Sequence, residues 1–230
     1  MPELPPPLPP ETRTVGQLVA ETIRFYGNRF WPSLAIGIPP AILVVAGAPL
    51  PQRYRLLLVL TAGTLLITVS YVRACALVLG RPRGSFAVAF AVGVLVFAPV
   101  PVLTAVSFLL VLPALAWLAL VGLAVPVVLV DGGGFRASIR RALELARADY
   151  VHALGGLATL VIVVFLSQAV LFFLLRGAGE AAVAVAGFLA NLVISPILFL
   201  GAALLYEDQA ARAKAGSAGR GRVRSSKRVA

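Results

Sequence analysis

Hydrophobic and polar positions in this chain are separated into long blocks, in contrast to the short periodic patterns of a soluble domain. From Gly84 to Val130 no residue is charged. Because about 20 apolar residues cross a bilayer once, this stretch is long enough for two crossings joined by a tight turn. We place the turn near residues 104–107. The pattern predicts a polytopic membrane protein.

Four other apolar blocks bring the expected number of spans to six. Short polar loops separate the blocks, and we expect helices because a lipid-embedded backbone must satisfy its own hydrogen bonds. The predicted fold class is therefore all-α, with about six transmembrane helices. The spans are placed at about Pro32 to Leu50, Leu56 to Leu79, two within residues 84–130, Ala153 to Leu175, and Ala181 to Tyr206.

Two further segments have an apolar face and a polar face at helical spacing. Residues 14–30 begin with Thr14 and Gln17, the pattern of a capping box at a helix N-terminus. Residues 135–150 place Phe135, Ile139, Leu143 and similar residues on one face, opposite a charged face. We interpret both segments as amphipathic helices lying at the membrane interface.

The chain is expected to divide into three parts. Residues 1–13 form a proline-rich arm, residues 14–208 a single six-span domain, and residues 209–230 a basic tail. The arm should be extended and solvated. The tail should lack regular structure beyond Lys214, because it is polar, basic and rich in glycine.

The distribution of charge predicts how the chain is oriented. The formal net charge is +11, while only 13% of residues are charged and the mean hydropathy is +0.97. With the N-terminus inside, only Arg53, Arg55 and Arg176 face outward, so both termini should be cytoplasmic. Because membrane orientation accounts for the basic residues, we do not expect a nucleic-acid partner. The abundance of Ala, Arg and Gly suggests a bacterial protein, and hence the inner membrane.

No pattern of residues indicates catalysis. The carboxylates are scattered, and the chain has one histidine, His152, and one cysteine, Cys75. We find no spacing for a catalytic metal, no nucleophile-elbow signature and no phosphate-binding loop. The sequence therefore predicts a protein that is not an enzyme and holds no cofactor or metal.

Polar side chains inside the spans are the candidates for a site. Arg73 is the only ionisable residue well inside a span, and such a residue is a functional candidate. It could instead extend to the headgroups or pair with Glu207 or Asp208 as they leave the last span. Gln168 and Asn191 fall at similar depth, which suits either an interhelical hydrogen bond or a polar ligand.

The charged face of residues 135–150 is the second candidate surface. It carries Arg136, Arg140 and Arg147, with Glu144 one turn from Arg140. Basic residues near a membrane surface attract anionic lipid headgroups. We therefore expect membrane lipids as partners at the inner face, with a protein partner as the other possibility.

The order of these features resembles a bacterial family. The segment TVGQLVAETIRFYGNRFWP opens the first span, VVLVDGGG precedes FRASIRRALELARADY, and the last span closes in LLYEDQ. This is similar to the membrane domain of glycerophosphoryl diester phosphodiesterases and the related YciC-like membrane proteins, over residues 11–214. Asp131 stands where that family usually has Glu, and Asp208 keeps the acid of the family's terminal motif.

The resemblance implies a membrane module without an enzyme, since the phosphodiesterase activity of that family belongs to a separate soluble domain. It assigns no substrate. The favoured hypothesis is a non-catalytic module that engages lipids or a partner protein at the inner face. The alternative is a small permease or lipid-translocating protein with a water-accessible cavity near Arg73, Gln168 and Asn191. We assign no oligomeric state from the sequence.

Overall fold

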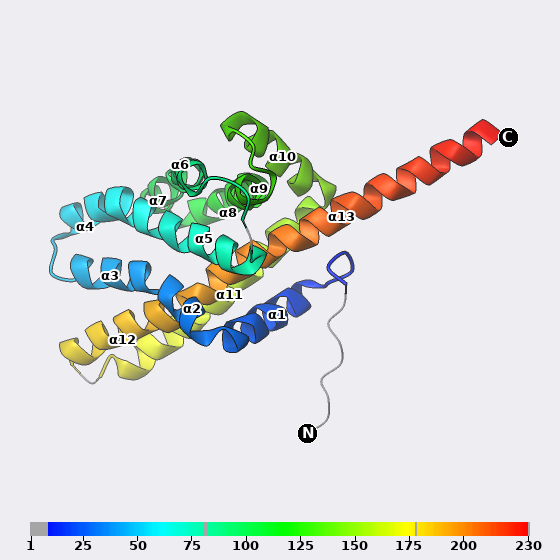
Figure 1. Cartoon of the computed structure of the whole chain (residues 1–230). Helices are drawn as coiled ribbons and strands as arrows, with labels where there is room; N and C mark the ends of the chain where they lie inside the picture. Colours follow the sequence, from blue (N-terminus) through cyan, green and yellow to red (C-terminus); the bar gives the residue numbers. More distant parts are fainter. Residues whose placement is uncertain (1–8, 81, 178, 230) are drawn as a thin grey trace, which may run out of the picture.

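A computed structural model describes residues 9–80, 82–177 and 179–229 (Figure 1). Over these ranges the regular structure is helical and contains no strand. Six segments are long and apolar enough to cross a membrane. The chain is therefore an all-α, multi-pass membrane protein, as the blocks of apolar residues predict. Most of the predicted proline-rich arm, residues 1–8, lies outside the described residues.

Most spans are built from two helices that follow one another closely. The first is α2 (Phe30–Ile36) and α3 (Ile38–Gly47), and the second is α4 (Gln52–Leu58), the π-helical turn η1 (Val59–Gly63) and α5 (Thr64–Leu79). The third is α6 (Phe86–Phe97) and α7 (Pro99–Val106); the fourth follows the 3-10 turn η2 (Phe108–Leu110) as α8 (Val111–Val121) and α9 (Ala124–Asp131). The fifth is α11 (Tyr150–Leu175), and the sixth is α12 (Glu180–Val193) with the first part of α13 (Ser195–Val229).

Proline and glycine explain where the spans are interrupted. Pro39 follows the break between α2 and α3, and Pro99 opens α7. Proline has no N–H to donate to the preceding turn, so the helix bends or restarts there. At the first break, Gly37 also lies against α12, because a side chain at this position would collide with the backbone carbonyl of Leu192.

The two amphipathic helices are present as α1 (Val15–Asn28) and α10 (Phe135–Ala148). The capping box of α1 is formed: the Thr14 hydroxyl accepts from the Gln17 N–H at 3.4 Å, and the Thr14 N–H donates to the Gln17 side chain at 2.8 Å. Their apolar faces pack on the bundle, α1 against α11 and α13, and α10 against α8, α9 and α13. They therefore close one end of the bundle.

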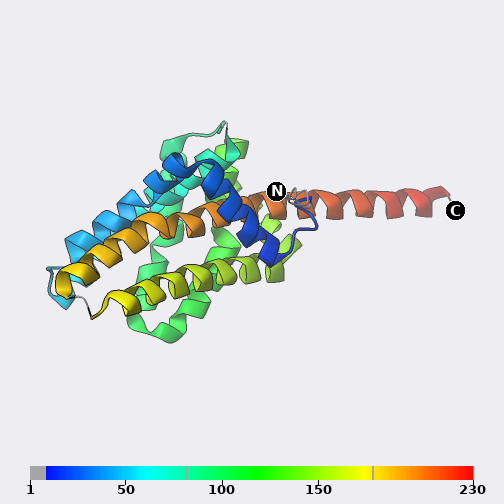
Figure 2. The same cartoon turned by 90° about the horizontal axis from the view of Figure 1, so that it is seen from below.

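Helix α13 passes through the centre of the bundle (Figure 2). It packs against α1, α5, α10 and α11, and Leu200 and Ala203 are buried in the core. The outer sides of the spans carry exposed apolar side chains, among them Ile162, Phe165 and Phe173 of α11. An apolar surface of this extent on a long helix suits a lipid environment.

The tail differs from the expectation that it lacks regular structure. Helix α13 continues without a break to Val229, well past Lys214. The reason lies in the residues around the end of the sixth span, where alanines, Gln209, Arg212 and Lys214 are strong helix formers. Beyond Lys214 the segment contains Gly216, Gly219 and Gly221, which are poor helix formers. The helix continues there because a packed helix has already completed the unfavourable nucleation step.

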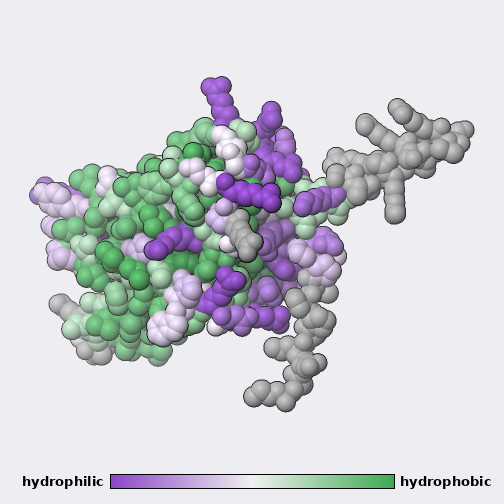
Figure 3. Space-filling model, viewed as in Figure 1, coloured by the Kyte–Doolittle hydropathy of each residue, from purple (hydrophilic) through white to green (hydrophobic). Residues whose placement is uncertain are grey.

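Polar residues are concentrated at one end of the bundle. We call this the basic end and define it as residues 11–24, 73, 80, 82–85, 131–149 and 207–214. In Figure 3 the hydrophilic side chains lie mainly beside the start of α13's projecting part, whereas the bundle body is apolar. The opposite end carries residues 48–51, between α3 and α4, together with the end of α11 and the start of α12 (Figure 1).

Candidate functional site

A buried ion pair lies at the centre of the basic end. Arg13 donates from Nη1 to Oδ1 of Asp208 at 2.7 Å. Asp208 is fully buried and Arg13 is 7% exposed. The pair fastens the segment before α1 to α13, although the two residues are 195 positions apart. Because two charges lose their hydration here, removal of one would leave the other buried without compensation.

A second pair extends this contact to the start of α11. Arg212 donates from Nη1 to Asp149 Oδ2 at 2.7 Å and from Nη2 to the Arg13 carbonyl at 2.7 Å. Gln209 donates to the Asp149 carbonyl at 3.2 Å. The Asp149 side chain also caps α11, since it accepts from the His152 N–H at 3.1 Å. Three segments far apart in sequence thus meet in one network.

His152 completes this group. Its Nε2 lies 3.7 Å from Asp208 Oδ2 and 3.5 Å from Arg212 Nη2. We refer to Arg13, Asp149, His152, Asp208, Gln209 and Arg212 as the ionic cluster. Its carboxylates are held by arginines, and within the described residues no three His, Cys, Asp or Glu side chains are grouped to hold a metal ion. The arrangement is that of a clamp between segments.

The ion pair considered for Arg73 is not formed, and that interpretation was wrong. Asp208 pairs with Arg13, and no carboxylate within the described ranges pairs with Arg73. Arg73 lies on α5 with an exposed side chain. From the sequence, Asp208 could be placed at the same end of the membrane domain as Arg73, but its pairing with Arg13 could not be predicted.

Arg73 lies in an open groove formed by α2, α5 and α6. The groove has a volume of about 410 Å³, and we call it the arginine groove. Apart from Arg73 its lining is apolar: Pro32, Ala35, Ile36, Ala76, Leu77 and Phe86. Arg29, between α1 and α2, donates to the carbonyl of Leu77 at 3.4 Å, so a second guanidinium lies beside the groove.

Gln168 and Asn191 are not brought together with Arg73. The Asn191 side chain donates to the carbonyl of Gly187 in its own helix at 2.9 Å, so the interhelical hydrogen bond with Gln168 is absent. Gln168 is half-buried on α11. Neither residue lines the arginine groove. The three side chains therefore do not share a cavity of the kind that the permease hypothesis requires.

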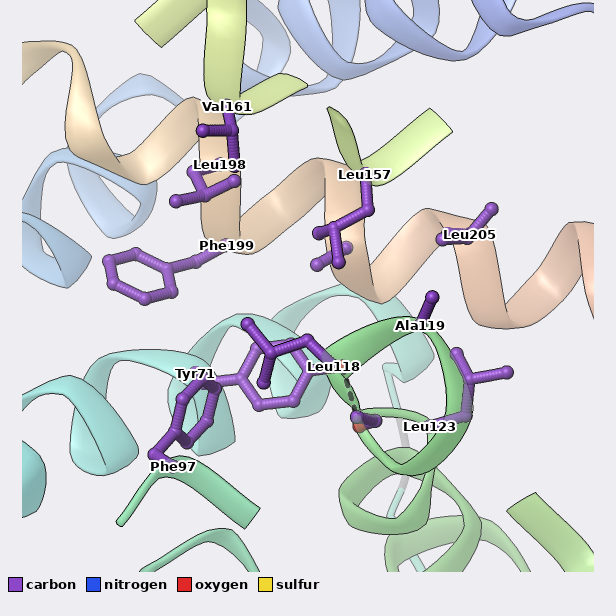
Figure 4. Close-up of a pocket in the computed structure, with 12 residues that line it drawn as sticks. Tyr71, Phe97, Leu118, Ala119, Leu123, Leu157, Val161, Leu198, Phe199 and Leu205 are labelled. Atoms are coloured by element: carbon purple, nitrogen blue, oxygen red, sulfur yellow. Dashed lines mark hydrogen bonds between the residues drawn. The ribbon is translucent and has the colours of Figure 1, made fainter. Parts of the chain in front are cut away.

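A smaller cavity of about 70 Å³ lies within the bundle (Figure 4). Its walls come from α5, α6, α8, α11 and α13 and include Phe97, Leu118, Leu157 and Phe199. The only hydroxyl in the lining, that of Tyr71, donates to the carbonyl of Gly122 at 3.1 Å. A lining of this kind offers no free polar group to a substrate, and such apolar cavities are usually dry.

The exposed face of α10 forms the remaining part of the basic end. Arg136 and Arg147 are exposed and make no ion pair with a described residue. Arg140 and Arg141 share Glu144, at 3.9 Å and 3.1 Å. This arrangement agrees with the predicted charged face of residues 135–150 and leaves a net positive surface.

Comparison with known proteins gave no match to a family model, a curated protein or a solved structure. The family resemblance stays a prediction, and functional inference rests on the geometry of this chain.

Proposed function

We propose that this protein is a non-catalytic membrane module that binds anionic phospholipid headgroups at its basic end, which faces the cytoplasm of a bacterial cell. One observation supports this proposal above all: exposed arginines gather at the same end of six apolar spans. Arg73, Arg136 and Arg147 are exposed there and pair with no carboxylate in the described part of the chain.

Membrane electrostatics explain why this arrangement would bind lipid. Basic residues near an anionic leaflet contribute roughly 1 kcal/mol each to the attraction, and the effect is confined to within a Debye length. An excess of Lys and Arg also marks the cytoplasmic side of membrane proteins. The same charges would therefore orient the protein and concentrate anionic lipid around its basic end.

The state of the carboxylates supports a role without catalysis. Asp149 and Asp208 are engaged by arginines, and Asp149 also caps α11. General acid or base work needs a carboxyl or imidazole that can reach a substrate. Asp149, His152 and Asp208 are instead part of the contact between segments.

Native mass spectrometry of the full chain would test the proposal. The protein is released from micelles after titration with either phosphatidylglycerol or phosphatidylcholine of the same acyl chains. We expect phosphatidylglycerol to be retained and phosphatidylcholine to be lost at the same concentration. Equal retention of the two lipids would contradict lipid selectivity, and hydrolysis of a phosphodiester by the purified chain would contradict the non-catalytic role.

A further inference from the structure

We propose that the arginine groove is a binding site for one anionic phospholipid, whose phosphate binds Arg73 and whose acyl chain lies against the apolar walls. This inference rests on the proposed function and deepens it, because it names the site at which one lipid binds specifically. The ionic cluster contributes no residue to the lining of this groove.

The position of Arg73 along its span suits a phosphate. The second span runs from Gln52 to Leu79, 28 residues, which corresponds to about 42 Å of helix. A hydrocarbon core of about 30 Å leaves several ångströms of this helix in each headgroup region. Arg73 lies about 9 Å from the end of α5, so its extended side chain reaches the headgroup level.

The exposed charge of Arg73 is available to an anion from outside the chain. A guanidinium in a partly apolar site is stabilised by an anion that accepts two parallel hydrogen bonds, and two oxygens of a tetrahedral phosphate can do so. The described carboxylates are engaged elsewhere or lie apart from Arg73. Arg29 beside Leu77 adds a second positive charge at the same groove.

The walls of the groove suit an acyl chain. Pro32 and Ile36 of α2 face Ala76 of α5, with Phe86 at the start of α6. Trp31, 76% exposed, stands next to this wall and packs edge-to-face on Phe30 with ring centroids 5.3 Å apart. Aromatic side chains of this kind gather at the headgroup level of membrane proteins. A positive charge beside apolar walls matches the anionic headgroup and the apolar acyl chain of a phospholipid.

The test compares two arginines of the same span by native mass spectrometry of the full chain with phosphatidylglycerol. Arg73→Gln should raise the Kd for the first bound lipid about tenfold, the value of one lost charge-assisted hydrogen bond. Arg53→Gln, at the opposite end of the span, should leave the Kd unchanged, since Arg53 lies over the Tyr54 ring away from the groove.

Two further variants separate charge from shape. Arg73→Lys keeps the charge but loses the paired donors, so the Kd should rise only about threefold. Ala76→Phe fills the groove without a change of charge and should also weaken retention of the lipid. Thermal unfolding of each variant in micelles identifies any that fails to fold.

The outcomes distinguish this inference from the proposed function. If wild-type protein prefers phosphatidylglycerol and Arg73→Gln keeps that preference undiminished, the groove is not the site and the function stands. If wild-type protein has no preference, both fail. Glycerol 3-phosphate that displaced the lipid at equal concentration would overturn the assignment to a lipid, because the acyl chain would then contribute nothing. A protein found in the groove by crosslinking from Ala35 would also overturn it.

Discussion

Arg13 and Arg73 lie on the same end of the molecule but in opposite circumstances. Arg13 is buried and its guanidinium is 2.7 Å from a carboxylate of the same chain. Arg73 is exposed in an apolar groove, and no described carboxylate pairs with it. In a chain with so few charges, this contrast separates an arginine that holds the fold together from one that is available to a ligand.

The largest loss of stability is expected when the buried pair of Arg13 and Asp208 is broken. Asp208→Ala leaves Arg13 buried without its carboxylate, and breaking such a pair costs about 3 to 5 kcal/mol. We expect the free energy of unfolding to fall by this amount in a titration with sodium dodecyl sulfate. A loss below about 1 kcal/mol, the size found for exposed pairs, would show that the cluster is solvated and would remove the contrast.

Arg212→Met should have the next largest effect. This change removes the hydrogen bonds of Arg212 to Asp149 and to the Arg13 carbonyl but keeps much of the side-chain volume. A hydrogen bond to a charged group contributes about 1.5 to 3 kcal/mol, so the free energy of unfolding should fall by about 2 kcal/mol. In the Asp208→Ala background the effect should be smaller, because the two arginines act in one network; full additivity would argue against a shared cluster.

Arg73→Gln should barely change stability while it weakens lipid retention. The change removes no ion pair to a described residue, and substitutions of exposed side chains usually stay within about 0.5 kcal/mol. The same titration in lipid-free micelles would measure the effect. If Arg73→Gln destabilised the protein as much as Arg212→Met, Arg73 would be a structural residue and the two regions would be alike.

The smallest effect is expected at the surface of α10. Glu144→Gln removes the ion pairs with Arg140 and Arg141, both of which are exposed. Such pairs are screened by solvent and contribute little. The unfolding titration should therefore show no change within its error. A clear loss would mean that α10 packs through Glu144, and Arg140→Gln would then be expected to reproduce it.

Much of the fold could be predicted from the sequence because the bilayer imposes a simple pattern. Runs of apolar residues give the six spans, and the capping box at Thr14 gives the start of α1. The charged face of residues 135–150 likewise gives α10. The boundaries are less well defined: the turn expected at residues 104–107 falls at Ser107 and η2. No charge marks this turn in the sequence.

The ionic cluster could not be predicted, since its members are far apart in the chain. Nothing in the local sequence relates Arg13 to Asp208, and the partner considered for Asp208 from the sequence was Arg73. One local signal was available for Asp149. It stands directly before the apolar run that begins at Tyr150, and this is where a capping residue is expected. The packing of α1 on α13 then decides which arginine reaches Asp208.

The contact between Arg13 and Asp208 has a consequence for biosynthesis. Arg13 leaves the ribosome 195 residues before its carboxylate, so every other span is made while this arginine has no partner. The last span then supplies Asp208 and Arg212 together and ties the start of the chain to its end. Completion of the sixth span is thus the step that fixes the segment before α1, and a chain interrupted before residue 208 would lack both contacts that hold this segment.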